Sequence, residues 1–313
     1  MRKTAGPSRK GRLYLHGMKI NVLDTYAGMR NVLQAHHNDR ARRLEQMWKP
    51  AAGMYRYFPG PTDLVAMHRA SSGFPIDRNI EETLEAVERL RSAHAWDRLG
   101  SAIDQAVAAV PEAMSRIELP ELTVIVVVGD YEDAIFRDEA LGLAATGGIS
   151  GYMHVNVLPT EENLRRLEAI AVHELHHNVR YSPGGVVWDP ATVTVGEHVV
   201  SEGLADAFAR EIYGDELGAT PIGVPHRHDD NVFRLVVDAL EVTGMHNLAP
   251  WVLGDPIAGR YGAAPVGAPT GAGYAAGNRL VDNYLRATGR TAAQSIHVDS
   301  GEVIEVGLSA DGE

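Results

Sequence analysis

Apolar residues in the first third of the chain recur at helical spacing. Between residues 79 and 96 they stand three or four positions apart and form one face of an amphipathic helix: Ile80, Leu84, Val87 and Leu90. Residues 97–110 continue this pattern, whereas residues 49–63 are rich in glycine and proline and predict a loop. We therefore expect a mostly helical N-terminal region.

The pattern of apolar residues changes after Pro120. Residues 122–129 are a run of mostly β-branched residues that ends at a glycine, which predicts a buried strand. Residues 147–159 alternate only in part between apolar and polar, and glycines stand at their start. They predict a second strand, at an edge of the sheet, because such a weak pattern suits an edge position.

Two long helices are predicted after these strands. Thr160 is a suitable N-cap and acidic residues follow it, so one helix begins there and ends at the stretch SPGG, residues 182–185. Residues 194–214 predict another helix, which ends at its last glycine. The C-terminal segments are expected to be a helix at 231–244, a glycine- and proline-rich loop at 253–273, a helix at 274–289 and a short extended piece within 295–308.

These elements predict an α+β fold that is mainly helical, with a small sheet whose edge strand precedes the helix beginning at Thr160. We expect four regions along the chain. They are a flexible basic tail (1–17), a mostly helical N-terminal region (18–115), a core with the strands and the two long helices (116–215) and a helical C-terminal subdomain (216–313).

The composition of the chain argues against some classes of binding partner. The chain has 313 residues, a net charge of -12 and no cysteine. The negative charge argues against nucleic acid or an anionic membrane as the main partner, and the absence of cysteine excludes disulfides, thiolate ligands and a cysteine nucleophile. The N-terminus lacks the apolar segment of a signal peptide, and no window is apolar enough to span a membrane, so we expect a cytoplasmic location.

The stretch AVHELHHNVRY, residues 171–181, carries the first candidate chemistry. His173 and His177 are four residues apart, so in a helix they project from one face and their imidazoles can converge on one cation. Glu174 lies about 100° around the helix, beside the cation, where a carboxylate can take a proton from water. His173 with His176 is an alternative pair, but it leaves Glu174 without this relation to the second ligand.

A catalytic zinc site needs a third protein ligand and an open position. The stretch SEGLAD on the next predicted helix offers Glu202 as that ligand, and Asp206, one turn later, can accept the second N–H of His173. Glu197 is the alternative carboxylate, but Ser201 rather than an acid follows it at this spacing. Without the histidine motif, these acids would be read as a solvated helix face.

The two motifs together resemble the gluzincin arrangement of zinc metallopeptidases, in which H-E-x-x-H is followed on a later helix by E-x-x-x-D. More narrowly, AVHELHHNVRY, VVSEGLADAFAREIYG and GYAAGNRLVDNYLRATGR are similar to the bacterial family of predicted Zn-dependent proteases, and MKINVLDTY extends the similarity from Met18 over nearly the whole chain. The resemblance implies a zincin-like metallopeptidase fold and zinc as the cofactor. It further implies His173, His177 and Glu202 as ligands and Glu174 as the base.

For such an enzyme we expect a peptide or protein substrate. The strand expected at 151–157 could pair with an extended peptide. Glu174 would take a proton from the attacking water and return it to the leaving amine. The oxyanion needs a further donor, for which Tyr274 is the first candidate; the others are Tyr181, Tyr261 and His228.

Two other functions remain open at this point. The protein could be a non-catalytic metal-binding regulatory module of the same fold, although such a module would not need Glu174. It could also be a zinc hydrolase of a non-peptide amide. A second metal site in the stretch HRHDD (His226, His228, Asp229) is less expected than a solvated loop, and His36 and His37 are expected at the surface.

Overall fold

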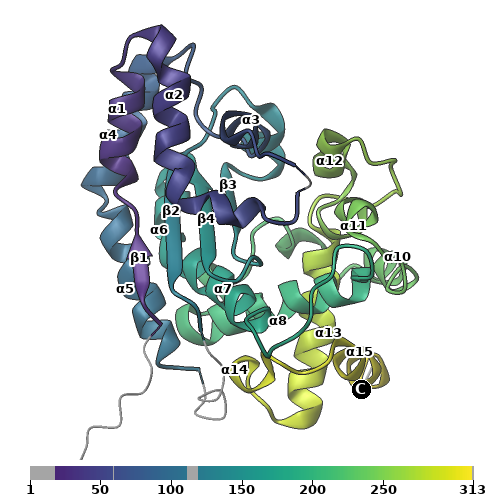
Figure 1. The fold of residues 1–313 in the computed structure, drawn as a ribbon. Coiled ribbons are helices and arrows are strands. Elements are labelled where there is room, and N and C mark those ends of the chain that lie inside the picture. The colour runs from purple at the N-terminus through teal and green to yellow at the C-terminus, as the bar shows by residue number, and fades with distance from the viewer. Residues whose placement is uncertain (1–17, 59, 111–118, 312–313) are drawn as a thin grey trace, which may run out of the picture.

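A computed structural model describes residues 18–58, 60–110 and 119–311, so the expected tail lies outside the described residues. A small sheet is surrounded by helices (Figure 1). Four strands make up the sheet in the order β1-β2-β4-β3: β1 (Ile20–Val22), β2 (Leu122–Val128), β4 (Tyr152–Val157) and β3 (Leu143–Thr146). The expectation of a mainly helical α+β fold with a small sheet is confirmed.

The strand predicted at 122–129 is β2, and it lies inside the sheet. It pairs in parallel with β1 on one side and with β4 on the other. All of its residues except Thr123 are buried. Its continuous apolar pattern follows from this position, because a parallel strand is covered on both faces.

The prediction that residues 147–159 form an edge strand is wrong. β4 lies between β2 and β3, and five of its six residues are buried. The edge is β3, which pairs antiparallel to β4 and exposes Ala144 and Thr146 in alternation. β3 has only four residues, two of them alanine, so it is too short and too weakly apolar to stand out in the sequence.

The helices predicted in the N-terminal region are present. They are α4 (Ile80–Ser92) and α5 (Ala95–Val107), preceded by α1 (Thr25–Leu33), α2 (His37–Trp48) and α3 (Leu64–Ala70). The predicted loop 49–63 begins instead with a 3-10 helix, η1 (Lys49–Tyr55). In Figure 1, α2 and η1 lie in front of the sheet, and α6 lies behind it.

The helix predicted from Thr160 is divided. Thr160 caps α6 (Glu161–Arg165) by accepting a bond from the Asn163 N–H, as predicted, but the helix breaks at Arg166 before α7 (Leu167–Arg180). The helix predicted at 194–214 is α8 (Val195–Tyr213), with Gly214 as its C-cap.

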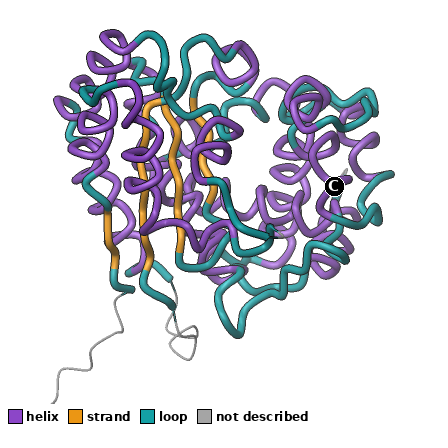
Figure 2. The backbone as a smooth tube through the Cα atoms, turned by 45° about the horizontal axis from the view of Figure 1, so that its top comes forward, coloured by secondary structure: helices purple, strands orange, loops and turns teal. Residues whose placement is uncertain are grey.

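The C-terminal helices lie beside the sheet (Figure 2). The longest of them is α13 (Ala272–Thr288), which corresponds to the helix predicted at 274–289. The prediction of an extended piece within 295–308 is wrong, because most of that segment is helix α15 (Ser300–Ser309). The predicted loop 253–273 contains two short helices, α12 (Asp255–Ala258) and η5 (Gly259–Tyr261). The remaining C-terminal helices are α9 (Asp215–Gly218), η4 (Val224–His226), α10 (Asp230–Val237), α11 (Met245–Val252) and α14 (Ala292–Ser295).

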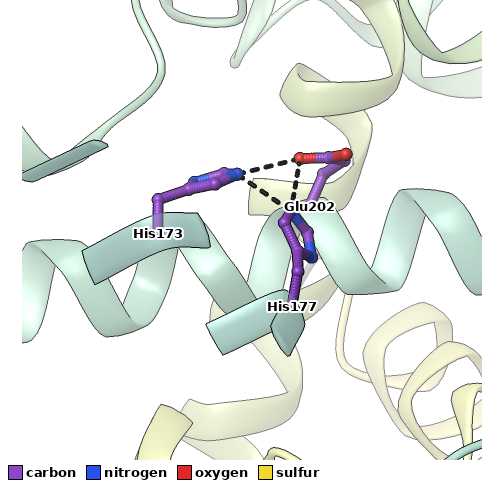
Figure 3. A group of neighbouring side chains, drawn as sticks. All are labelled: His173, His177 and Glu202. Atoms are coloured by element: carbon purple, nitrogen blue, oxygen red, sulfur yellow. Dashed lines mark hydrogen bonds and ion pairs between the residues drawn. The ribbon is translucent and has the colours of Figure 1, made fainter. Parts of the chain in front are cut away.

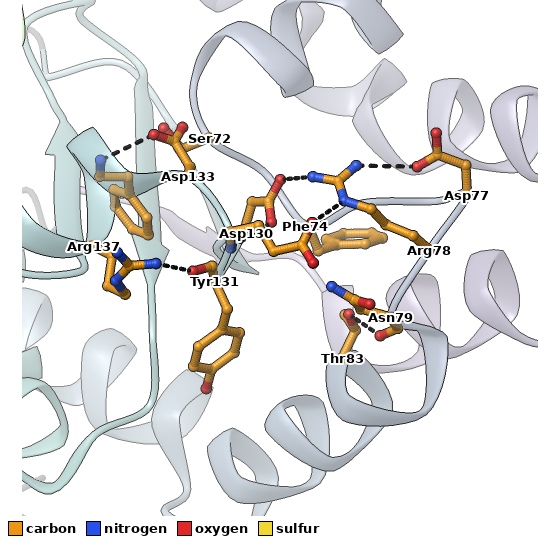
Figure 4. A network of polar contacts seen from close by, with 12 residues as sticks. Ser72, Phe74, Asp77, Arg78, Asn79, Thr83, Asp130, Tyr131, Asp133 and Arg137 are labelled. Carbon is orange, nitrogen blue, oxygen red and sulfur yellow. Dashed lines mark hydrogen bonds and ion pairs between the residues drawn. The ribbon is translucent and has the colours of Figure 1, made fainter.

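A polar network lies at the carboxyl end of β2. Figure 4 shows Arg78 reaching Asp130, with the side chains of Ser72 and Asp133 nearby. The Asp130 N–H donates to the Ser72 carbonyl at 2.8 Å. From the C-terminal part, Arg260 donates to the Ser72 hydroxyl at 2.7 Å and pairs with Asp133. The glycine-rich C-terminal loop is therefore bound to the connections at the carboxyl end of β2.

Across the described ranges, no helix combines the length and the apolar character that crossing a membrane requires. The division of the chain into four regions stays a prediction.

Candidate metal centre

Two packed helices carry the candidate metal-binding side chains. α7 presents His173 and His177 from successive turns, and α8 packs against it and presents Glu202. The two histidines are buried, and the Glu202 side chain is only 13% exposed. The helical spacing of the two histidines and the packing of α8 against α7 thus place all three side chains in one enclosed space.

The three side chains meet at their tips (Figure 3). The Nε2 atoms of His173 and His177 are 3.0 Å apart. Oε2 of Glu202 lies 3.0 Å from the first and 3.2 Å from the second. No other group of three or more potential ligands converges in this way within the described ranges.

This donor set fits a zinc ion. Nδ1 of His173 faces a carboxylate oxygen of Asp206 at 2.9 Å and must donate to it, so Nε2 of a neutral His173 carries a lone pair. That lone pair, the second imidazole and the Glu202 carboxylate all point at one place, and a cation there removes their mutual repulsion. Ligand atoms about 2.0–2.2 Å from a tetrahedral zinc are about 3.3–3.6 Å apart, close to the observed separations.

The electrostatics of the group also favour a positive charge. Burial alone would lower the pKa of His173, but its bonds to Asp206 and Glu202 outweigh this effect and raise that pKa well above its usual value. Burial likewise opposes ionisation of Glu202, yet the charges of His177 and His173 and their bonds to it lower its pKa far below the usual range.

The second nitrogen of each histidine has a different partner. Asp206, fully buried on α8, accepts from His173 and also from Asn278 at 2.7 Å and the Thr220 hydroxyl at 2.6 Å. Nδ1 of His177 lies 2.9 Å from the Ser201 hydroxyl. These contacts fix both rings, as partners of metal-bound histidines do.

Glu174 lies beside this group without belonging to it. It is 4% exposed, and burial raises the pKa of its carboxyl, against the lowering effect of His173 and His177. The backbone N–H of Gly147, just after β3, lies against the carboxylate. A Cβ at Gly147 would come within 2.2 Å of the Glu174 carbonyl oxygen, so only glycine permits this approach. Glu174 thus stands between the histidines and the edge strand.

Tyr274 reaches the same space from α13. Its ring centroid is 6.4 Å from that of His173. Burial, and then the neighbouring carboxylates Glu202, Glu174 and Asp206, raise the pKa of its hydroxyl well above the usual value. Tyr274 is therefore a neutral O–H donor near the three side chains.

Glu197 contacts Arg180 and Tyr181. Glu197, the second carboxylate that the sequence offered as a ligand, forms a buried ion pair with Arg180, with two contacts of 2.8 Å. Tyr181 donates to Glu197 at 2.8 Å. Tyr261 is 61% exposed, and His228 is also exposed.

Comparison with known proteins places the chain in a family. A family model described as Predicted Zn-dependent protease (DUF2268) matches residues 96–305. The chain belongs to this family. A relative in Bacillus subtilis (strain 168), named Uncharacterized protein YjfC, is 29% identical over 265 residues, which are 84% of this chain and 87% of that protein. No solved structure matches.

The matched region contains both helices of the candidate site and Tyr274. The remaining histidines of the sequence motifs lie outside the converging group. His176 is fully buried against Phe208 and, among the described residues, has no hydrogen-bond partner at either nitrogen. His36 and His37 are exposed, as expected. Asp229 of the HRHDD stretch caps α10, and this stretch forms no ligand group in the part of the chain that the structure describes.

Sequence analysis missed His198 and the role of Ser201. His198 lies one turn before Glu202, on the same face of α8, and its Nε2 accepts from the Trp188 indole N–H at 3.1 Å. The spacing of four residues to Glu202 was the signal that could have identified His198. No spacing rule could have identified Ser201, because its partner His177 is on another helix.

Proposed function

We propose that this protein is a zinc-dependent metallopeptidase with His173, His177 and Glu202 as the metal ligands. One observation carries the proposal: three electron-rich atoms converge within 3.2 Å of one another, and a separate buried carboxylate, Glu174, lies beside them. A site that only bound metal would need the first three groups but not the fourth. The family description supports zinc and proteolysis.

A zinc ion held by these residues would polarise a scissile carbonyl and make a water molecule easier to deprotonate. Glu174 accepts the proton of the attacking water and returns it to the leaving amine. Its raised pKa suits the first step, because a more basic carboxylate takes the proton of the water more readily, and the carboxyl that results is still acidic enough to protonate an amine. Asp206 holds His173 in the tautomer that leaves Nε2 free.

The peptide substrate would be held by β3, in place of the strand first expected. β3 is at the edge of the sheet and ends one residue before Gly147, whose N–H faces Glu174. A peptide that pairs with β3 in extended conformation passes Glu174.

The proposal is tested by removing the metal, returning it, and measuring peptide cleavage at each step. The purified protein is incubated with a peptide library, with a chelator, and with the chelator followed by excess zinc. We expect cleavage that is lost with the chelator and restored by zinc, and His177→Ala should neither hold zinc nor cleave. Cleavage of a non-peptide amide instead of peptides, or zinc binding without any cleavage, would contradict the peptidase proposal.

Tyr274 is the proposed donor to the oxyanion. Tyr274→Phe removes only the hydroxyl, so we expect bound zinc and KM to remain while kcat falls about 10- to 100-fold. Steady-state kinetics on a cleaved library peptide measures this. An unchanged kcat would assign the role to another donor.

A further inference from the structure

Two loops bring the exposed Tyr57 and the half-buried Trp188 together beside the candidate metal centre. Tyr57 and Phe58 follow η1 and are 41% and 49% exposed. Trp188 is in the loop between α7 and α8, and its ring centroid is 5.3 Å from that of Tyr57. Val187, next to it, is 88% exposed. We name Tyr57, Phe58, Val187 and Trp188 the aromatic patch.

The aromatic patch is connected to the metal-binding helix. Trp188 donates its indole N–H to Nε2 of His198 at 3.1 Å, and the two rings meet edge to face at 6.2 Å. His198 stands one turn before Glu202 on the same face of α8, so it extends the row of side chains that faces the metal centre. Trp188 is thereby held in a fixed orientation next to the site.

The aromatic patch is also connected to the end of β3. Arg56, next to Tyr57, donates to the carbonyl of Ser150 at 3.1 Å. Ser150 belongs to the short connection that joins Thr146, the last residue of β3, to β4. Gly147, in the same connection, lies against Glu174. The aromatic patch is therefore near the Thr146 end of the edge strand.

We propose that the aromatic patch is a specificity subsite that binds a large apolar or aromatic side chain of the peptide, on the amino-terminal side of the scissile bond. This inference rests on the proposed peptidase function. Antiparallel pairing is the more stable arrangement, and a peptide antiparallel to β3 runs from the Thr146 end towards Leu143. Its amino-terminal residues then lie near the aromatic patch, and its carboxyl-terminal residues lie near the start of α7.

The chemistry of the aromatic patch selects this class of side chain. Its exposed surface is mainly aromatic and aliphatic, and burying such surface against an apolar side chain is favourable, whereas burying a charged side chain there is not. Arg56 lies over the Tyr57 ring at 5.3 Å and further disfavours a cationic side chain by repulsion. We therefore expect phenylalanine, tyrosine or leucine to be preferred and lysine or arginine to be disfavoured.

Cleavage-site profiling tests the subsite in the zinc-loaded protein. The parent, Trp188→Ala, Tyr57→Ala and the control Leu308→Ala, an exposed apolar residue on α15, are compared on one peptide library. We expect an aromatic or leucine preference amino-terminal to the bond, lost in Trp188→Ala, weakened in Tyr57→Ala and kept in the control. A flat profile on that side, or a preference that survives Trp188→Ala, overturns the inference. Equal zinc content and melting temperature exclude misfolding as the cause.

A binding measurement separates this inference from the proposed function. Glu174→Gln loaded with zinc is titrated calorimetrically with two blocked hexapeptides of alanine residues, one of which has phenylalanine as its third residue. We expect the phenylalanine peptide to bind about tenfold more tightly, and the difference to disappear when Trp188→Ala is added. Equal affinities would overturn the subsite even if the parent cleaves peptides. Failure of the parent to cleave would contradict the peptidase, while this titration would still decide the subsite.

Discussion

At the scale of single residues, the two candidate histidine ligands differ in what holds their second nitrogen. His173 is held by a buried carboxylate, Asp206, and His177 by a hydroxyl, Ser201. A carboxylate fixes the tautomer and increases the electron density of the ring, whereas a hydroxyl can donate or accept and does much less. The two positions therefore contribute unequally to metal affinity.

Replacing Asp206 should weaken zinc binding without removing any proposed ligand. We expect Asp206→Asn to lower zinc affinity about 10- to 100-fold, the usual effect of losing such a partner, and Ser201→Ala to lower it less. Competition with a chromogenic chelator measures both. Equal losses in the two variants would show that the charge of Asp206 has no special part in the site.

The sequence was sufficient to predict which side chains share one face of the same helix. His173, Glu174 and His177, and then Glu202 and Asp206, follow from a period of 3.6 residues. Contacts between elements could not be derived in this way. The Gly147 N–H against Glu174 and the Trp188 indole against His198 depend on how loops fold back, and no local pattern encodes that.

At the scale of elements, the site depends on how closely α8 and α13 approach. A Cβ at Gly203 would come within 2.2 Å of the Gly277 carbonyl oxygen, and a Cβ at Gly277 within 2.1 Å of the Val199 carbonyl oxygen. This contact brings Asn278 to Asp206 and places Tyr274 near the histidines. The two glycines thus set the distance between the ligand helix and the proposed oxyanion donor.

Separating these two helices should destabilise the protein. Gly203→Ala forces backbone apart at the crossing, and we expect the free energy of unfolding to fall by about 1–3 kcal/mol. Gly259→Ala is the matched control, because a Cβ there meets nothing within 4 Å and the backbone is helical. Urea denaturation measures both variants. A Gly203→Ala protein as stable as the control would contradict the tight crossing.

The sequence identified most helices but misplaced the edge of the sheet. Helical periodicity marked α4, and a terminal glycine marked the end of α8. Strand order, by contrast, depends on pairing between distant segments: β1 and β3 are three and four residues long, and each is recognisable only through its partner. The edge strand that we propose to bind the substrate could therefore be identified only from the structure.

At the scale of the whole molecule, one buried histidine links stability to pH. His154 on β4 packs against Trp48, and its Nε2 has no hydrogen-bond partner among the described residues. Burial, and then the nearby His68, lower the pKa of His154 to about 3. Since the unfolded value is about 6.5, the unfolded chain binds the extra proton between these values. The stability contributed by neutral His154 is therefore full above pH 6.5 and is lost as the pH falls towards 3.

Removing this titration should flatten the pH dependence. Between pH 7 and pH 5, His154 alone should cost the parent about 2 kcal/mol of unfolding free energy. We expect His154→Leu to lose about that much less over the same range, since leucine cannot take up a proton. Urea denaturation at the two pH values measures this, and an unchanged pH dependence would show that His154 is accessible to protons in the folded protein.

We propose that Glu174 acts on the substrate while other residues hold the metal. This proposal is tested most directly by measuring bound zinc and peptide turnover in the same preparation of Glu174→Gln. We expect a single zinc ion per chain, as in the parent, and a turnover at least about 100-fold lower, because the general base is gone. Turnover equal to that of the parent at full zinc occupancy would contradict it.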